Sequence, residues 1–246
     1  MQNRYTGDIG DFSKLGLLRA LSNAGFTIGL NWYLTPNETH NEDGKHTKYL
    51  CQAEKYRFLD PQLFDELKEI IDSGSREVSA MEKPEILEAK FFSEILDFPI
   101  SSTIREVRRD WHSRALQEMK GKDIVCLDPD NGLIVPYATG TRRENKYVLR
   151  EELQDYYQLG SSVIYYQHKA RRKDEYYREQ ISSQMRDFQD AAGLMLKFRT
   201  TSQRYYMFIL QPQHKDIVKE TICTMLEKGW KNHFRLYEDL VFISRL

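Results

Sequence analysis

The chain has 246 residues, of which 36 are Lys or Arg and 37 are Asp or Glu, so its formal net charge is −1. This balance excludes a strong overall field for a polyanion, and any nucleic-acid binding would need a local basic patch. Three scattered cysteines argue against a disulfide or zinc framework, and the lack of a signal region or spanning apolar run predicts a cytoplasmic protein without membrane contact.

The order of helical and strand patterns predicts a single α/β domain over residues 1–246. Helices are expected at 11–25 with Asp11 as cap, at 60–74, 102–121 and 149–159, from 173 to about 192, and at 215–228. Strands are expected at 26–34, 123–128, 162–168, 194–200, 205–210 and 234–243. Residues 75–100 show no clear pattern, and we expect a variable insertion there.

The predicted strand at 123–128 runs directly into polar turn residues. Its apolar part, 124–127, does not alternate, which is typical of a strand buried on both faces. Asp128, Asp130 and Asn131 follow at once, so we expect them at the carboxyl edge of a parallel sheet, where open α/β folds bind ligands. These residue types also form ordinary turns, which leaves a structural role open.

Other predicted strand ends carry similar side chains. The loop after 26–34 is rich in His, Asp and Asn, and the strand at 162–168 ends in His168. If these strands are parallel, their polar ends meet at one edge of the sheet, beside the start of the first helix. The candidates gathered there are Asp8, Asp11, His40, Asn41, Asp43, His46, Asp128, Asp130, Asn131 and His168.

Two kinds of chemistry fit these groups. In the first, Asp128 and Asn131 accept hydrogen bonds from an amino group and present a base nitrogen to a methyl donor. In the second, carboxylates hold Mg²⁺ while a histidine moves protons in phosphodiester hydrolysis. The carboxylates of this alternative are Asp8, Asp11, Asp128 and Asp130.

Three further patterns are less informative. A zinc site at His40, Asp43 and His46 is disfavoured because these residues lack the helical i, i+4 spacing. Arg171 and Arg172 lie in a basic run that fits phosphate contact as well as a solvated helix start. Tyr165, Tyr166, Tyr176 and Tyr177 are expected to pack in a core or an interface. The sequence has neither a Walker loop nor a nucleophile elbow, which disfavours kinase-like phosphate binding and serine hydrolysis.

Three segments resemble the bacterial ribosomal-RNA adenine-N6 methyltransferases. Thr6-Gly-Asp-Ile-Gly-Asp-Phe-Ser-Lys14 is similar to that family's Ala-Gly-Asn-x-x-Ala-Asp-x-x-Lys segment, and Thr39-His-Asn-Glu-Asp-Gly44 is similar to its Thr-His-Ala-Gly-x-Gly donor loop. The family's catalytic Asp-Pro-Pro-Tyr falls on Asp128-Pro-Asp-Asn131. The chain also resembles an uncharacterised bacterial and phage family that shares Gly-Asp-Ile-Gly-Asp-Phe and Leu-Asp-Pro-Asp-Asn-Gly.

The resemblance implies a class I methyltransferase-like, Rossmann-like α/β fold, with a three-layer, mainly parallel sheet and an antiparallel strand near the carboxyl terminus. It also implies S-adenosylmethionine as cofactor. We place the cofactor near Lys14, His40, Asn41, Asp43 and Gly44. We assign catalysis to Asp128, Asp130, Asn131 and His168, and substrate binding to Asp8, Asp11, His46, Arg171 and Arg172.

The departures from the family motif shape the functional hypothesis. Glu42 replaces the first glycine of the donor loop, and Asp130 and Asn131 replace the proline and the aromatic residue that stack on a flipped adenine. Our first hypothesis is a divergent methyltransferase acting on a base amine of a nucleic acid or nucleotide. The alternatives are a Mg²⁺-dependent phosphodiesterase or nuclease, and a non-catalytic nucleotide-binding protein in phage–host conflict.

Overall fold

A computed structural model describes residues 1–38, 46–200 and 203–237 of the chain. Within these ranges the α-helices are α1 (Ile9–Asn23), α2 (Ala53–Tyr56), α3 (Pro61–Asp72), α4 (Ile104–Met119), α5 (Arg150–Gln158), α6 (Asp174–Gln184) and α7 (Lys215–Glu227). The strands are β1 (Ile28–Asn31), β2 (Ala89–Phe92), β3 (Ile124–Leu127), β4 (Gly132–Leu133), β5 (Tyr147–Val148), β6 (Ser162–His168), β7 (Ala192–Phe198), β8 (Arg204–Leu210) and β9 (Phe234–Tyr237). No helix in the described ranges is long and apolar enough to cross a membrane.

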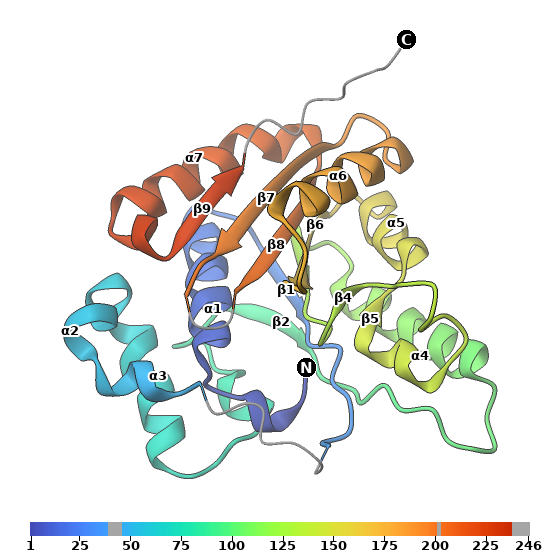
Figure 1. The fold of residues 1–246 in the computed structure, drawn as a ribbon, viewed down its shortest axis with the longest axis horizontal. Coiled ribbons are helices and arrows are strands. Elements are labelled where there is room, and N and C mark those ends of the chain that lie inside the picture. The colour runs from blue at the N-terminus through green and yellow to red at the C-terminus, as the bar shows by residue number, and fades with distance from the viewer. Residues whose placement is uncertain (39–45, 201–202, 238–246) are drawn as a thin grey trace.

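Seven strands form one sheet in the order β2-β1-β3-β6-β8-β7-β9 (Figure 1). Strands β2, β1, β3 and β6 pair in parallel, whereas β8 is antiparallel to both β6 and β7, and β9 is antiparallel to β7. Strand β7 therefore runs in the same direction as β6. The predicted Rossmann-like α/β fold, with a mainly parallel sheet and antiparallel pairing near the carboxyl terminus, is confirmed.

Helices cover both faces of this sheet (Figure 1), which gives three layers. One core joins the inward faces of α1, α3 and α7 to the sheet, and a second core joins α4, α5 and α6 to the opposite face. Side chains of β3 alternate between the two cores: Ile124 and Cys126 belong to the first, and Val125 and Leu127 to the second. Burial on both faces explains why this strand reads as a continuous apolar run.

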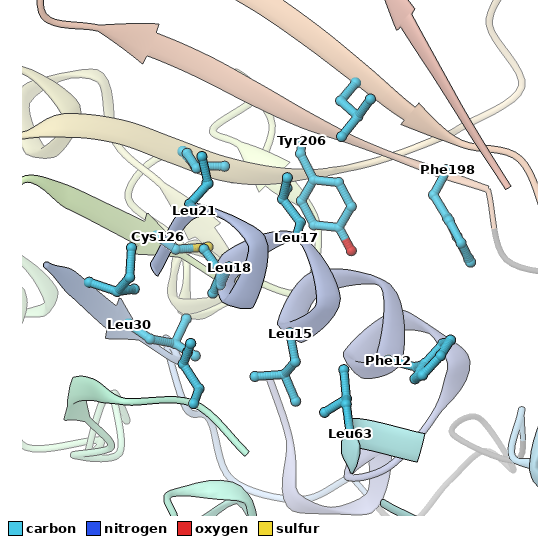
Figure 2. Close-up of a cluster of buried hydrophobic side chains, with 14 of the residues drawn as sticks. Phe12, Leu15, Leu17, Leu18, Leu21, Leu30, Leu63, Cys126, Phe198 and Tyr206 are labelled. Atoms are coloured by element: carbon cyan, nitrogen blue, oxygen red, sulfur yellow. The ribbon is translucent and has the colours of Figure 1, made fainter. Parts of the chain in front are cut away.

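Helix α1 is buried along most of its length, because the sheet lies on one side and α3 and α7 pack on others. Figure 2 shows its apolar side chains among residues of the sheet and of α3. A helix enclosed in this way must give each of its polar side chains a partner. The hydroxyl of Ser13 donates to the carbonyl of Gly10 at 2.8 Å and lies 2.7 Å from the hydroxyl of Tyr206.

Two predicted segments differ from the structure. Residues 89–92, inside the expected insertion, form the edge strand β2 and pair along all of β1, so this part of the segment belongs to the sheet. The strand was missed because it is short and followed by charged and polar residues rather than by a turn signal. Helix α6 ends at Gln184, ahead of the predicted limit near 192: a 3₁₀ turn over Met185–Asp187 follows it, and β7 begins at Ala192. Most of the strand expected at 234–243 lies outside the described residues.

Candidate functional site

The sheet reverses its strand order beside β1. Strand β2 lies on one side of β1 and β3 on the other, so the carboxyl ends of β1 and β3 form the topological switch point. Open α/β sheets bind ligands in the crevice outside such a point. Here the backbone N–H of Asp128, the residue after β3, donates to the carbonyl of Asn31, the last residue of β1, at 2.9 Å. The residues predicted from the Asp-Pro-Asp-Asn motif therefore lie at this switch point. We call the group of residues at the carboxyl ends of β1 and β3 the switch-point crevice.

Lys14 of α1 pairs with Asp128, the first residue of the Asp-Pro-Asp-Asn motif. Its ammonium lies 2.6 Å from Oδ2 of Asp128 and 2.8 Å from Oδ1 of Asp11, and these side chains are 3–8% exposed. The ammonium also lies 4.5 Å from the ring centroid of Trp32. Burial by itself lowers the pKa of Lys14, but the two carboxylates outweigh it and raise that pKa. Lys14 is therefore a fixed positive charge that links α1 to the end of β3.

Asp11 has an unusual protonation behaviour. Burial raises its pKa to about 6, and the nearby Asp8 and Asp128 add to the rise, while Lys14 opposes it. Its second oxygen, Oδ2, accepts the backbone N–H of Gly7 at 2.9 Å. Both oxygens of Asp11 are thus engaged in holding the start of α1 against Lys14.

Asp8, and not Asp11 as predicted, caps α1. Its Oδ1 accepts the backbone N–H groups of Gly10 at 2.7 Å and of Asp11 at 3.0 Å. Two aspartates at a spacing of three, both next to glycine, offer the same capping signal in the sequence, and the structure selects the first. Asp11 therefore does not cap the helix, and its Oδ1 accepts a hydrogen bond from Lys14 instead.

The guanidinium of Arg204 packs against Gly10, where a larger residue would leave it no space. A Cβ atom on Gly10 would lie 1.5 Å from Nη1 of Arg204 and 2.3 Å from its Cζ. Arg204 is 8% exposed, and its Cζ lies 5.4 Å from the ring centroid of Tyr166. Burial lowers the pKa of Arg204, but neighbours including Tyr166 and Asp8 raise it overall. We did not predict Arg204; a glycine within the first turn of a buried helix is the signal that indicates such a close approach.

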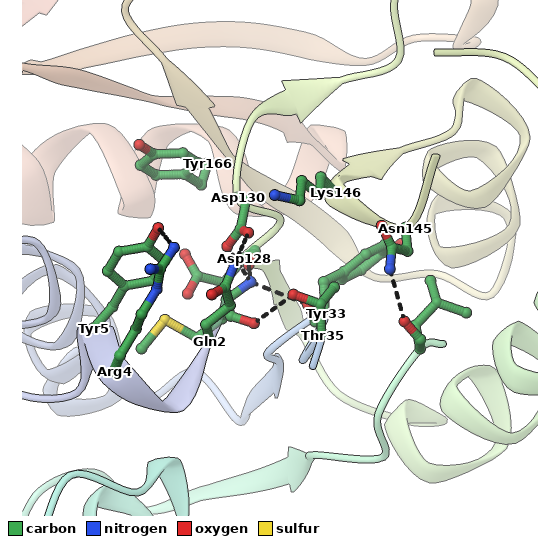
Figure 3. Close-up of polar contacts among 12 residues, drawn as sticks. Gln2, Arg4, Tyr5, Tyr33, Thr35, Asp128, Asp130, Asn145, Lys146 and Tyr166 are labelled. Carbon is green, nitrogen blue, oxygen red and sulfur yellow. Dashed lines mark hydrogen bonds and ion pairs between the residues drawn. The ribbon is translucent and has the colours of Figure 1, made fainter. Parts of the chain in front are cut away.

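Above Asp128, several oxygen atoms converge on one nitrogen. The amine of Met1 donates to the carbonyls of Tyr33 at 3.0 Å and of Asp128 at 3.1 Å, and lies 2.9 Å from Oδ1 of Asp130 (Figure 3). Oδ2 of Asp130 accepts Nε2 of Gln2 at 3.0 Å. Burial would raise the pKa of Asp130, but the Met1 ammonium and Gln2 lower it overall. The crevice therefore presents acceptors that are arranged around an amine.

Of the remaining predicted residues, Asn131 and His168 adjoin this group, whereas Arg171 and Arg172 do not. Asn131 joins its neighbours by backbone bonds: its N–H donates to the carbonyl of Lys146 at 2.9 Å, and its carbonyl accepts the N–H of His168 at 3.1 Å. His168 is exposed as a residue, but neighbouring atoms partly desolvate its ring, and this together with the charges of Arg204 and Lys169 lowers its pKa. Arg171 and Arg172 are exposed between β6 and α6, away from the ion pairs of the crevice.

The predicted donor loop, residues 39–44, lies outside the described residues. This applies to His40, Asn41, Asp43 and Gly44, and so to two of the three residues of the disfavoured zinc set. The two residues that border the undescribed stretch are both fastened at the crevice: the N–H of Glu38 donates to Oε1 of Gln2 at 3.0 Å, and the carbonyl of His46 accepts the N–H of Ile9 at 3.1 Å. His46 itself is exposed and touches the site through its backbone.

The residues directly after β1 are large and buried. Trp32 donates from Nε1 to Oε1 of Glu82 at 2.9 Å, and the hydroxyl of Tyr33 donates to Oε2 of Glu152 at 3.0 Å. Tyr33 adopts a φ of 45°, a left-handed conformation that normally favours glycine. Dinucleotide-binding folds use glycines at this first turn so that the cofactor can approach the backbone. The described residues at the end of β1 therefore do not form such a glycine cradle. The predicted donor loop itself lies outside the described residues, so S-adenosylmethionine stays a prediction.

Among the described residues, no group of three or more His, Cys, Asp or Glu side chains could hold a metal ion. The four carboxylates proposed for Mg²⁺ already have partners: one oxygen of Asp8 caps α1, both oxygens of Asp11 and Asp130 are bonded, and Oδ2 of Asp128 is paired with Lys14. A metal would have to displace these contacts.

Comparison with known proteins finds similarity among solved structures. No family model matches the chain, and no curated protein matches it. The solved structure of protein LPL1258 from Legionella pneumophila str. Philadelphia 1, described under the family model DUF519, is similar with a TM-score of 0.45 and 12% sequence identity. The match covers 94% of this chain and 96% of that one. This identity is too low to transfer residue roles.

Proposed function

We propose that the chain binds a nucleotide or a nucleic-acid base at the switch-point crevice and holds the exocyclic amine of the base beside Asp128. The observation that carries the proposal is the set of acceptors around one nitrogen: the carbonyls of Tyr33 and Asp128 and the carboxylate of Asp130, at 2.9–3.1 Å. An exocyclic amine presents the same kind of N–H donor. A base bound at this point takes the place of the Met1 amine.

Asp128 is the residue best placed to orient such an amine. Its Oδ2 is held by Lys14 at 2.6 Å, which fixes the carboxylate, while Oδ1 receives no hydrogen bond from the part of the chain that the structure describes. A charged acceptor that is fixed but not saturated is suited to bind a donor, because little ordering remains to be done on binding. Tyr166, near the end of the neighbouring β6, offers an aromatic ring close enough to Asp128 and Asp130 for their charges to raise the pKa of its hydroxyl.

Methyl transfer is the catalytic form of this proposal. Its support is the resemblance of the Asp128 motif and the Lys14 segment to adenine-N6 methyltransferases, together with the Rossmann-like fold. Trp32 and Tyr33 favour a second candidate, in which the crevice binds the base without a methyl donor, because they fill the turn where a donor approaches the backbone. We do not extend the Mg²⁺ alternative, because both oxygens of Asp11 and of Asp130 are bonded to Gly7, Lys14, Met1 and Gln2, and a metal would have to displace these contacts.

Calorimetric titration separates these candidates. The wild-type chain is titrated with adenosine and with S-adenosylmethionine, each with and without Mg²⁺. We expect adenosine to bind without Mg²⁺ and to lose at least tenfold in affinity in Asp128→Asn, since a charge-assisted hydrogen bond contributes about 1.5–3 kcal/mol. Asp65→Asn is the matched control, because it neutralises an exposed carboxylate on α3 that is paired with Arg57.

The outcomes are distinct. Binding of S-adenosylmethionine at micromolar concentration supports methyl transfer, whereas adenosine binding alone supports the second candidate. Adenosine binding that is equal in wild type and Asp128→Asn would refute the role of the Asp128 carboxylate in orienting the amine, and no adenosine binding by the folded wild type would refute the proposed function. Ligand binding that occurs only in the presence of Mg²⁺ would support the phosphodiesterase alternative instead.

A further inference from the structure

Three separate segments meet at Glu38, which lies next to the crevice and is bonded to Gln2. Nη2 of Arg4 lies 3.3 Å from Oε2 of Glu38, and Nη1 of Arg4 donates to the backbone carbonyl of Glu38 at 2.9 Å. From the other side, Nζ of Lys146 contacts Oε1 of the same carboxylate. One glutamate thus lies between two cations, one from the amino-terminal segment and one from the turn before β5.

This group adjoins the acceptors that surround the Met1 amine. The side chain of Gln2 bridges the two places, since Oε1 accepts the N–H of Glu38 and Nε2 donates to Asp130. The carbonyl of Lys146 accepts the N–H of Asn131, so Lys146 is also tied directly to the Asp-Pro-Asp-Asn turn. Figure 3 shows Arg4 and Lys146 in the same view as Gln2 and Asp130.

We infer that Arg4 and Lys146 form a phosphate subsite, in which the carboxylate of Glu38 takes the place of the ligand's phosphate when no ligand is bound. This inference rests on the proposed function and deepens it: the ligand is phosphorylated, a nucleotide and not a nucleoside, with its base at Asp128 and its phosphate between the two cations. A ligand phosphate binds by displacing Glu38.

The exchange is favourable on physical grounds. The side chains of Arg4, Glu38 and Lys146 are 15%, 27% and 24% exposed, and ion pairs that water reaches are weak and easily broken. A phosphate monoester carries −1.5 to −2 charges and three acceptor oxygens, where Glu38 offers one charge and two oxygens. Arginine binds phosphate through its planar fork, and Arg4 is already oriented by its contacts with Tyr5, with a 3.0 Å hydrogen bond to the hydroxyl.

Nearby acids do not cancel this attraction. Asp130, the acid next to the subsite, is paired with the Met1 ammonium at 2.9 Å and bonded to Gln2. Its charge is therefore balanced as long as Met1 occupies the crevice, which is the state that a titration with inorganic phosphate alone examines. The charge that opposes an incoming phosphate is that of Glu38 itself, which leads to a simple expectation: removal of that charge strengthens phosphate binding, although it removes a contact from the folded chain.

Calorimetric titration with inorganic phosphate tests the inference. We expect Glu38→Gln to bind phosphate about three- to tenfold more tightly than wild type, which corresponds to one or two weak surface ion pairs. Lys146→Gln should bind it more weakly than wild type. Asp65→Asn makes the same change in net charge on the exposed Arg57–Asp65 pair of 2.7 Å and should leave phosphate affinity unchanged. Thermal unfolding verifies that all variants are folded.

A second comparison uses adenosine and adenosine 5′-monophosphate. The nucleotide should bind more tightly than the nucleoside in wild type, and Lys146→Gln should remove this advantage without changing the affinity for adenosine. Equal phosphate binding in wild type and Glu38→Gln, or an equal gain in Asp65→Asn, would overturn the subsite while adenosine binding at Asp128 still stands. Failure of adenosine to bind, with the phosphate responses as expected, would instead count against the proposed function.

Discussion

Replacing Lys14 with methionine tests whether charge or packing holds the crevice together. Methionine fills a similar volume, but the ammonium that contacts Asp11 at 2.8 Å and Asp128 at 2.6 Å is lost. Removal of one partner from a buried ion pair typically costs about 3–5 kcal/mol, because the remaining charge has no compensation. We therefore expect Lys14→Met to lower the free energy of unfolding by about that amount at pH 8.

The loss should depend on pH in a defined direction. The pKa of Asp11 is about 6 in the folded chain, above the ordinary value of 3.8 for this carboxyl group, so its contribution to stability is full below 3.8 and is lost as the pH rises through 6. Lys14 opposes this rise, and its removal moves the pKa of Asp11 further up. Each unit by which the pKa of Asp11 rises further lowers the free energy of unfolding of the variant by about 1.4 kcal/mol at pH 8, relative to wild type. The destabilisation should therefore be larger at pH 8 than at pH 6.

Urea unfolding of wild type and Lys14→Met at both pH values measures the effect. The double variant Lys14→Met/Asp11→Asn should remove most of the added pH dependence, because the titrating group is gone. Lys68→Met, which breaks an exposed pair with Asp72, is the control and should cost less than about 1 kcal/mol at either pH. A loss from Lys14→Met below 1 kcal/mol, or one that is equal at the two pH values, would refute the electrostatic account.

Two further predictions concern the neighbours of this ion pair. Gly10→Ala should lower the free energy of unfolding by about 1–3 kcal/mol in urea titration, since the new Cβ would lie 1.5 Å from Nη1 of Arg204; helix propensity alone predicts the opposite sign, a gain of about 1 kcal/mol. Tyr166→Ala should weaken adenosine binding about five- to hundredfold in calorimetry if the ring stacks on the base, whereas Tyr166→Phe should keep the affinity; equal losses in both would assign the effect to the hydroxyl, which lies 3.4 Å from Nδ1 of His168.

The sequence predicted the fold well where one local signal was enough. The strand at 124–127 and the strand starting at Ser162 were found because their apolar runs are bounded by turn residues. The helix after Asp60 was found from its Asp-Pro start, and the structure confirms that Oδ1 of Asp60 accepts the N–H of Leu63 at 3.1 Å. Such signals act within a few residues, so no knowledge of the remote chain is needed.

The contacts of the site depend on residues that are far apart in the chain. Lys14 and Asp128 are separated by 114 positions, and the residues around either one do not indicate that the other is its partner. A partial signal existed: Lys14 lies on the same helical face as Leu17, Leu18 and Leu21, and a lysine on an apolar face indicates a buried partner. The tyrosines divide in a way that the sequence could not show: Tyr165 and Tyr177 are buried, whereas Tyr176 is exposed and Tyr166 is partly exposed at the crevice.

The structure also separates architectural acids from the acid that is available to a ligand. Asp8 caps α1, and Asp11 uses both oxygens to join Gly7 and Lys14, so changes at either residue disturb the position of Lys14 and, through it, Asp128. A loss of binding in such variants would therefore not identify a ligand contact. Asp128 differs, because Lys14 fixes one oxygen and leaves the other for a donor. Asp128→Asn keeps the size and the backbone contacts of this residue, which makes it the substitution whose effect on binding, measured in a folded chain, bears directly on the chemistry of the crevice.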